Sequence, residues 1–197
     1  MALQPNPFGK EYLCQKSTAL QVKQKYWSCV KNTGRGFCIT FPYDDSPSFT
    51  IGTKKMGKHR TFQDEYGRIL CCLERNFLSK EHAWILTRGS ERLLTVHYRC
   101  LPWKMTIKME GSADQEMSKV LEVKCLDTWC SGFVVKLGDW TIMRLHCINM
   151  MNNMLSSFKV TPPVWDVDVV EGTDLLLASV LSVIISDAYS EMHLYML

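Results

Sequence analysis

The sequence lacks the local signatures of the common enzyme classes and of metal centres. It contains no Gly-x-Ser-x-Gly element, no P-loop and no dinucleotide-binding glycine fingerprint. His97-x-x-Cys100 and the adjacent His146-Cys147 have metal-capable atoms, but no second pair at a zinc-finger spacing completes either one. A cysteine and a histidine that meet only in the fold remain an open alternative. We therefore predict no catalytic residues, no metal ligands and no cofactor.

Targeting signals and disulfide patterns are also absent. The chain does not begin with a positive charge followed by an apolar stretch, so no secretory signal is predicted. Its nine cysteines are odd in number within 197 residues, which favours reduced thiols over a disulfide framework. The adjacent Cys71 and Cys72 fit small apolar fillers on the two faces of one strand. The expected location is the cytoplasm.

Long hydrophobic runs are absent apart from one near the C-terminus. The uncharged stretch Leu175–Ser186 spans about 18 Å as a helix, whereas a bilayer needs about 20 apolar residues. Its apolar side chains cover nearly every angle, so the helix must be surrounded on all sides. We predict a buried core helix over about 173–190, with Thr173 or Gly172 as N-cap and Asp174 in the first turn. A membrane anchor is the alternative.

The remainder of the chain is predicted to form about a dozen short strands separated by turns. The expected strands include residues 20–24, 37–41, 49–51, 69–73, 83–86, 93–98, 103–107, 120–124, 130–135, 141–146, 157–160 and 164–170. So many strands favour a mainly β fold, an antiparallel closed β-barrel wrapped around the C-terminal helix. A β-sandwich with the helix on one face is the alternative. Residues 1–16 are expected to be a partly ordered arm, and residues 17–197 a single domain.

Positive charge is concentrated in the first half of the chain. Residues 1–110 hold 18 Lys and Arg against 9 Asp and Glu, and residues 111–197 hold 5 against 11. This asymmetry points to an anionic partner for the first half, unless folding mixes the two halves. Six tryptophans lie mostly in or beside strands and are expected in the core and wall. They do not alternate with a basic stripe, so nucleic acid is not an expected partner.

A cluster of basic residues between two expected strands is the candidate site. Its members are Lys54, Lys55, Lys58, His59 and Arg60. Such a cluster suits phosphate groups, including those of anionic phospholipid headgroups. A solvated turn without a ligand is the alternative. Further basic residues that could extend the cluster are Arg68, Arg75, Lys80, Arg88 and Arg92.

Three segments resemble the LURP-one-related proteins of the tubby C-terminal-like superfamily. They are Phe49–Gly52 leading into Arg60–Gly67, Ile69–Arg75 through Trp84–Gly89, and Trp165–Asp187. The last resembles the closing strand, turn and buried helix of the family, with Glu171 where the family usually has proline. The likeness spans roughly residues 17–190.

The resemblance implies a twelve-stranded barrel around a C-terminal helix. It also implies a non-enzymatic binding protein, because the wider superfamily includes tubby proteins that bind phosphoinositides and associate with membranes. LURP-one-related members are linked to plant defence. Two functions are therefore expected as alternatives: peripheral association with anionic phospholipid or phosphoinositide at the plasma membrane, or protein interaction in stress or defence signalling. No scramblase calcium motif and no residue-by-residue match to the tubby phosphoinositide site is present.

Overall fold

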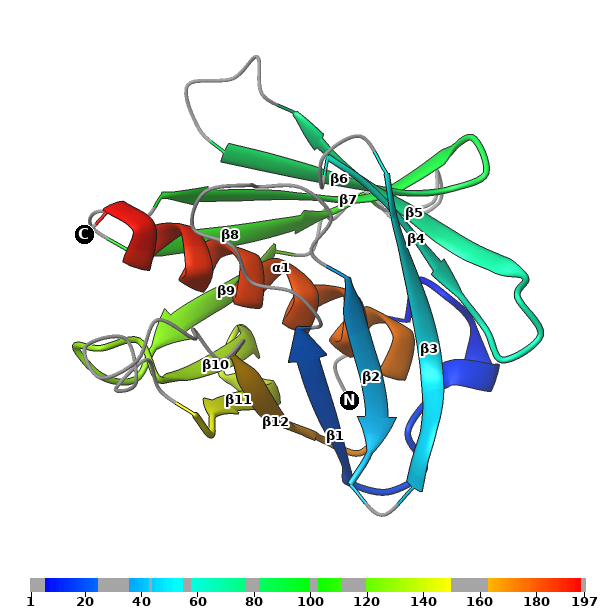
Figure 1. The fold of residues 1–197 in the computed structure, drawn as a ribbon, viewed down its shortest axis with the longest axis horizontal. Coiled ribbons are helices and arrows are strands. Elements are labelled where there is room, and N and C mark those ends of the chain that lie inside the picture. Colours follow the sequence, from blue (N-terminus) through cyan, green and yellow to red (C-terminus); the bar gives the residue numbers. More distant parts are fainter. Residues whose placement is uncertain are drawn as a thin grey trace.

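The computed structural model describes residues 6–24, 36–42, 44–54, 58–76, 82–99, 103–110, 120–149 and 163–195. Within these ranges, twelve antiparallel strands form a closed barrel around one long helix, α1, as Figure 1 shows. The strands are β1 (Thr18–Gln24), β2 (Phe37–Phe41), β3 (Asp44–Lys54), β4 (His59–Gln63), β5 (Ile69–Asn76), β6 (His82–Arg88), β7 (Glu91–Arg99), β8 (Lys104–Met109), β9 (Val120–Cys125), β10 (Gly132–Leu137), β11 (Trp140–Cys147) and β12 (Val164–Val169). The predicted fold is confirmed.

The barrel closes where the first strand meets the last. β1 pairs with β2 on one side and with β12 on the other, and Leu20 lies opposite Val167. Every other pairing joins strands that are consecutive in the chain. The β-sandwich alternative is therefore wrong, because no edge separates two sheets. Alternate residues point inward, as in β12, where Trp165, Val167 and Val169 are buried and Asp166 is exposed.

The helix α1 (Leu175–Tyr195) fills the barrel. Its 21 residues span about 31 Å. Because the barrel surrounds the helix, apolar side chains are favourable on every side of it. The segment Leu175–Met192 is long and apolar enough to cross a membrane, but 94% of it is buried inside the barrel. The prediction of a core helix is confirmed, although the helix extends beyond residue 190.

Asp174, rather than Thr173 or Gly172, caps the start of the helix. Its Oδ1 accepts hydrogen bonds from the backbone N–H groups of Leu176 and Leu177, both at 3.0 Å. The hydroxyl of Thr173 is occupied elsewhere, because it donates to the carbonyl of Ile142 at 3.2 Å. The carboxylate of Asp174 is therefore outside the first turn, where it satisfies two N–H groups that lack helical partners.

Residues 6–16 cross the barrel end at which α1 begins. Phe8 is 1% exposed, and its N–H donates to Oδ2 of Asp174 at 3.0 Å. Cys14 exchanges backbone hydrogen bonds with the turn before the helix, donating to Thr173 and accepting from Gly172. A short 3-10 helix, η1 (Lys10–Tyr12), lies between these contacts. The described part of the expected arm is therefore packed against the barrel.

The two ends of the barrel are named from the helix. The proximal end holds the start of α1, η1 and the turns that follow β4, β6 and β10. The distal end holds the C-terminal part of α1 and the connections that follow β3, β5, β7 and β9. In Figure 1 the distal end lies to the left, beside the C-terminus, and η1 lies to the right.

Candidate functional site

The predicted basic cluster lies at the distal end, but its members face different ways. β3 ends at Lys54 and β4 begins at His59, so the cluster spans a strand connection. Lys58 is exposed, and His59 is half-buried with Nε2 3.5 Å from Oε1 of Glu74. Lys55 and the side chain of Lys54 lie outside the described residues. Lys58 is therefore the described member that presents its charge to solvent.

The structure corrects the prediction that Arg60 belongs to the anion-binding cluster, because its side chain points into the barrel. Its side chain is 2% exposed and pairs with the carboxylate of Asp187 on α1. The guanidinium also lies 5.0 Å from the ring centroids of Phe37 and Trp84. Residues of β4 alternate in burial, so the neighbours His59 and Arg60 must face opposite sides. Arg60 anchors the helix and cannot present its charge at the surface.

A second buried pair lies next to the first. Arg75 of β5 binds Glu191 with both terminal nitrogens, and its Nη2 donates to the hydroxyl of Tyr98 at 3.1 Å. The Tyr98 hydroxyl in turn donates to Glu191 at 2.7 Å. Trp84 contacts both guanidinium groups, and Cζ of Arg75 lies 5.6 Å from the centroid of its ring. The distal half of α1 is thus fixed by buried charge.

Electrostatics support this arrangement. Burial alone would lower the pKa of Arg75, but its hydrogen bond to Glu191 and the nearby acidic groups raise the pKa above its usual value. Burial and the negative charge of Glu191 raise the pKa of Tyr98, so its hydroxyl remains a donor. The sequence signal for these contacts is the spacing of Asp187 and Glu191, which lie one helical turn apart after the apolar run.

The other residues proposed to extend the basic cluster do not do so where they are described. The Arg75 side chain is 9% exposed and pairs with Glu191, as described above. Arg68, Arg88 and Arg92 lie at the proximal end, where Arg68 pairs with Asp64 and Arg92 with Glu110. Nη1 of Arg88 donates to the carbonyl of Phe8. Lys80 lies outside the described residues.

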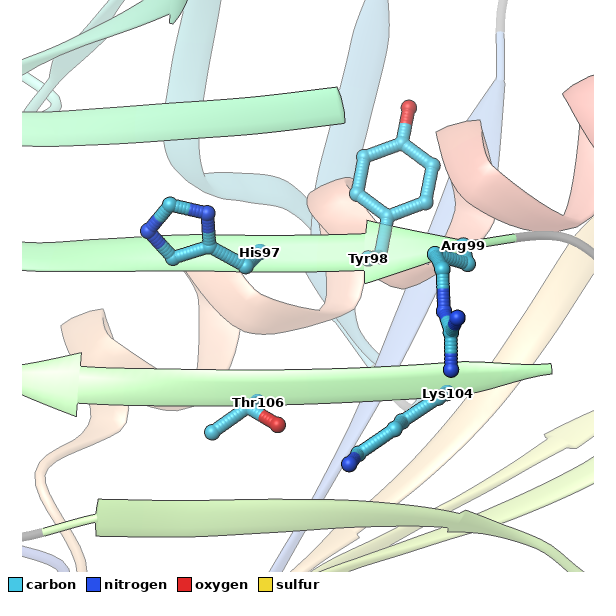
Figure 2. A pocket seen from close by; sticks show the side chains of 5 residues that line it. All are labelled: His97, Tyr98, Arg99, Lys104 and Thr106. Carbon is cyan, nitrogen blue, oxygen red and sulfur yellow. The ribbon is translucent and has the colours of Figure 1, made fainter. Parts of the chain in front are cut away.

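A pocket of about 350 Å³ lies on the outer wall of β7 and β8, near the distal end. Figure 2 shows its lining residues, with Arg99 reaching from β7 toward Lys104 on β8. The complete lining is His97, Tyr98, Arg99, Lys104 and Thr106. The Tyr98 ring points away from the other four side chains, toward the helix. The pocket therefore presents an imidazole, a hydroxyl and two fixed positive charges.

The two positive charges of the pocket lie directly opposite each other. Arg99 and Lys104 are cross-strand partners in the β7–β8 pairing, and both are exposed. Like charges in this position repel each other. Among the described residues, neither side chain forms a salt bridge, and the same is true of Lys108 farther along β8. An anion bound between Arg99 and Lys104 would relieve the repulsion. Alternation along the strands could have indicated this pair, but its register was not predicted.

The connection between β9 and β10 adds exposed apolar side chains to the distal end. Leu126 is 60% exposed and Trp129 is 70% exposed. The carboxylate of Asp127 holds the loop, because it accepts hydrogen bonds from the N–H groups of Trp129, Ser131 and Gly132. Burial raises the pKa of the Asp127 carboxyl, but its hydrogen bonds with Ser131, Trp129 and Gly132 together outweigh burial and lower the pKa below its usual value.

The exposure of Trp129 corrects its predicted place in the core or wall, and Trp140 at the proximal end is likewise 62% exposed. Trp84 and Trp165 are buried as predicted.

Comparison with known proteins identifies similar sequences and folds. A family model described as LURP-one-related matches residues 18–187. An X-ray structure of a protein from Arabidopsis thaliana superposes with a TM-score of 0.61 at 17% sequence identity. The superposition covers 91% of this chain and 96% of the Arabidopsis chain. No curated protein matches the sequence. At this identity the structural likeness supports the fold, and the family match supports the resemblance found in the sequence.

Proposed function

This chain belongs to the LURP-one-related family, and we propose that it is a binding protein that associates with anionic phospholipid through its distal end. The observation that carries this proposal is the opposed pair of Arg99 and Lys104 beside a pocket of about 350 Å³. Lys58 is exposed at the same end, on the β3–β4 connection. A phosphate group accepts several charge-assisted hydrogen bonds at once, which matches two converging cationic side chains.

The exposed apolar residues at the distal end support the same proposal. A membrane surface offers anionic headgroups above an apolar layer, and tryptophan is enriched at this boundary. Trp129 and Leu126 protrude from a loop that is held by Asp127 at the same end as the basic residues. Charge and apolar contact would thus act together. The helix α1 would take no part, because it is enclosed by the barrel.

Vesicle co-sedimentation tests the proposal. The full chain is mixed with vesicles of phosphatidylcholine alone, or with vesicles that also contain a phosphatidylinositol bisphosphate. We expect recovery only with the second kind. Replacing both charges in Arg99→Gln/Lys104→Gln should weaken binding roughly tenfold to thirtyfold, since each basic residue near an anionic leaflet contributes about 1 kcal/mol.

The matched control removes two positive charges from the proximal end. Lys10 and Lys16 are exposed there, so Lys10→Gln/Lys16→Gln changes the net charge equally without touching the distal pocket. Equal losses in the two double variants would indicate attraction by net charge alone. Equal recovery with the two kinds of vesicle would contradict the proposal. Competition by inositol bisphosphate in solution distinguishes recognition of the headgroup from recognition of the membrane surface.

Protein interaction in signalling is the second candidate function. It is favoured by the exposed side chains of Tyr66 and Ile69 at the proximal end, which are 76% and 60% exposed. In this case, vesicles would not bind, and a saturable protein partner would be lost on replacement of Tyr66 and Ile69 by serine. Variants of Arg99 and Lys104 would retain that partner.

A further inference from the structure

Two thiols lie in contact at the base of the distal β9–β10 loop. The Sγ atoms of Cys125 and Cys130 are 2.7 Å apart. A disulfide requires about 2.05 Å between the same atoms, so a small displacement brings them to bonding distance. Among the described cysteines, no other pair of sulfur atoms is in hydrogen-bond contact. Cys130 is buried in the hydrophobic core, and Cys125 packs half-buried against that core at the barrel end.

The backbone of the loop holds the two thiols together. The N–H of Cys130 donates to the carbonyl of Asp127 at 3.1 Å, and Leu126 donates to Gly132 at 2.9 Å. Cys130 has a φ of +53°, a left-handed conformation that costs energy for a residue other than glycine. The hydrogen bonds to the Asp127 carboxylate maintain this conformation. The loop therefore holds the two sulfur atoms close together before any bond between them forms.

Three other described cysteines, Cys71, Cys72 and Cys147, are placed differently. Cys71 and Cys72 are neighbours in β5 and face opposite sides of the sheet. Burial raises the pKa of the Cys71 thiol, and burial raises the pKa of Cys147 to about 11. Burial also raises the pKa of Cys130, so the difference lies in the sulfur contact: among the described residues, neither Cys71 nor Cys147 has a second sulfur atom within hydrogen-bond distance.

We propose that Cys125 and Cys130 are a redox modification site that forms a reversible disulfide in the presence of hydrogen peroxide. The thiolate of the more accessible Cys125 attacks one peroxide oxygen, the O–O bond breaks, and the hydroxide that leaves takes up a proton to form water. The product is a sulfenic acid on Cys125. The sulfur of Cys130 then attacks the Cys125 sulfur, the S–O bond breaks, and a second water leaves with the proton of the Cys130 thiol. Two thiols are oxidised and one peroxide is reduced to two waters, and a dithiol reductant reverses the change.

The disulfide would close a ring that contains Leu126 and Trp129. Because these side chains are exposed, the bond would restrain the apolar part of the β9–β10 loop that faces solvent. This inference does not depend on lipid binding, since it rests on the two sulfur atoms and the loop that holds them.

Digestion with trypsin offers a direct test. Cleavage after Lys124 and Lys136 places both cysteines, and no others, in one peptide of residues 125–136. Cleavage after Arg68 and Arg75 likewise isolates Cys71 and Cys72 in a peptide of residues 69–75. The second peptide is an internal control with the same number of thiols. The reduced full chain is exposed to hydrogen peroxide, blocked with N-ethylmaleimide, digested and analysed by mass spectrometry.

We expect peptide 125–136 to lose two hydrogen atoms and to escape labelling until a dithiol is added. It should be oxidised about tenfold faster or more than peptide 69–75, because preorganised groups react faster. Chains unfolded in urea before oxidation should lose this difference. If native peptide 125–136 instead carries two maleimide labels after peroxide treatment, or is oxidised no faster than peptide 69–75, the proposal is wrong. Sulfinic acid at Cys125 without the disulfide would contradict it as well.

Discussion

The two ends of the barrel hold the same helix by different chemistry. At the proximal end, Asp174 caps the helix and accepts a hydrogen bond from Phe8, and backbone groups of residues 6–16 complete the closure. At the distal end, Arg60 and Arg75 pair with Asp187 and Glu191 inside the barrel. Buried ion pairs contribute little net stability, but they penalise any arrangement that separates the partners. The proximal end therefore closes the fold, and the distal end fixes where the helix lies.

The largest effect is expected when one distal charge loses its partner. Asp187→Ala leaves the Arg60 guanidinium buried without its carboxylate, and we expect a loss of about 3–5 kcal/mol in the free energy of unfolding. Urea denaturation followed by circular dichroism measures it. The double variant Arg60→Met/Asp187→Leu should recover most of this loss, because both charges are removed together. A double variant no more stable than Asp187→Ala would show that the pair is not the main contribution.

The proximal end is expected to respond to pH. Burial raises the pKa of Asp174 to about 6, although hydrogen bonds from Leu177, Phe8 and Leu176 oppose the shift. The unfolded chain titrates near 4, so the folded state binds the proton more tightly. This contribution to stability is complete below about pH 4 and is lost as the pH rises through about 6, a change of roughly 2–3 kcal/mol.

The variant Asp174→Asn isolates this titration. Asparagine is also a good N-cap but carries no charge. The difference in free energy of unfolding between Asp174→Asn and the wild type should therefore shift in favour of the variant between pH 4 and pH 7. Urea denaturation at several pH values measures this difference. A difference that does not change with pH would mean that Asp174 has an ordinary pKa in the folded protein.

The smallest effect on stability is expected at the exposed distal loop. Trp129→Ala should change the free energy of unfolding by about 0.5 kcal/mol or less, because the side chain is 70% exposed. Trp165→Ala, which removes a fully buried ring, should cost about 3–5 kcal/mol. Thermal and urea unfolding compare the two variants. If Trp129→Ala retains the fold but weakens vesicle recovery, the loop belongs to the binding surface; unchanged recovery would remove it from the proposed site.

Periodicity and length favoured the barrel over the sandwich and the enclosed helix over a membrane anchor, because the helix is apolar on all sides. They missed strand β4, and the strand expected at residues 157–160 lies outside the described residues. Composition was not sufficient to predict the side on which a charge lies. Arg60 belongs to a basic run whose composition suggests exposed side chains. Its position in β4, however, directs its side chain inward toward Asp187. That outcome depends on where β4 begins, which composition does not specify.

Contacts between distant segments were also beyond prediction. The packing of Phe8 against the start of the helix joins residues 166 positions apart, and nothing near Phe8 in the sequence indicates its partner. The opposed pair of Arg99 and Lys104 depends on the register of β7 and β8. The exposed position of Trp129 depends on a loop conformation that the Asp127 carboxylate maintains. Each of these features depends on the folded structure rather than on local sequence.

The enclosed helix also constrains the order in which the molecule can assemble. α1 follows all twelve strands in the chain, and β1 must wait for β12 before the wall can close. During synthesis, the strands emerge before the segment that fills them. Until the helix arrives, the inward apolar side chains of the nascent wall and both edge strands remain open to wrong partners. We therefore expect the enclosure of the helix to come late in folding, after the strands that surround it have been synthesised.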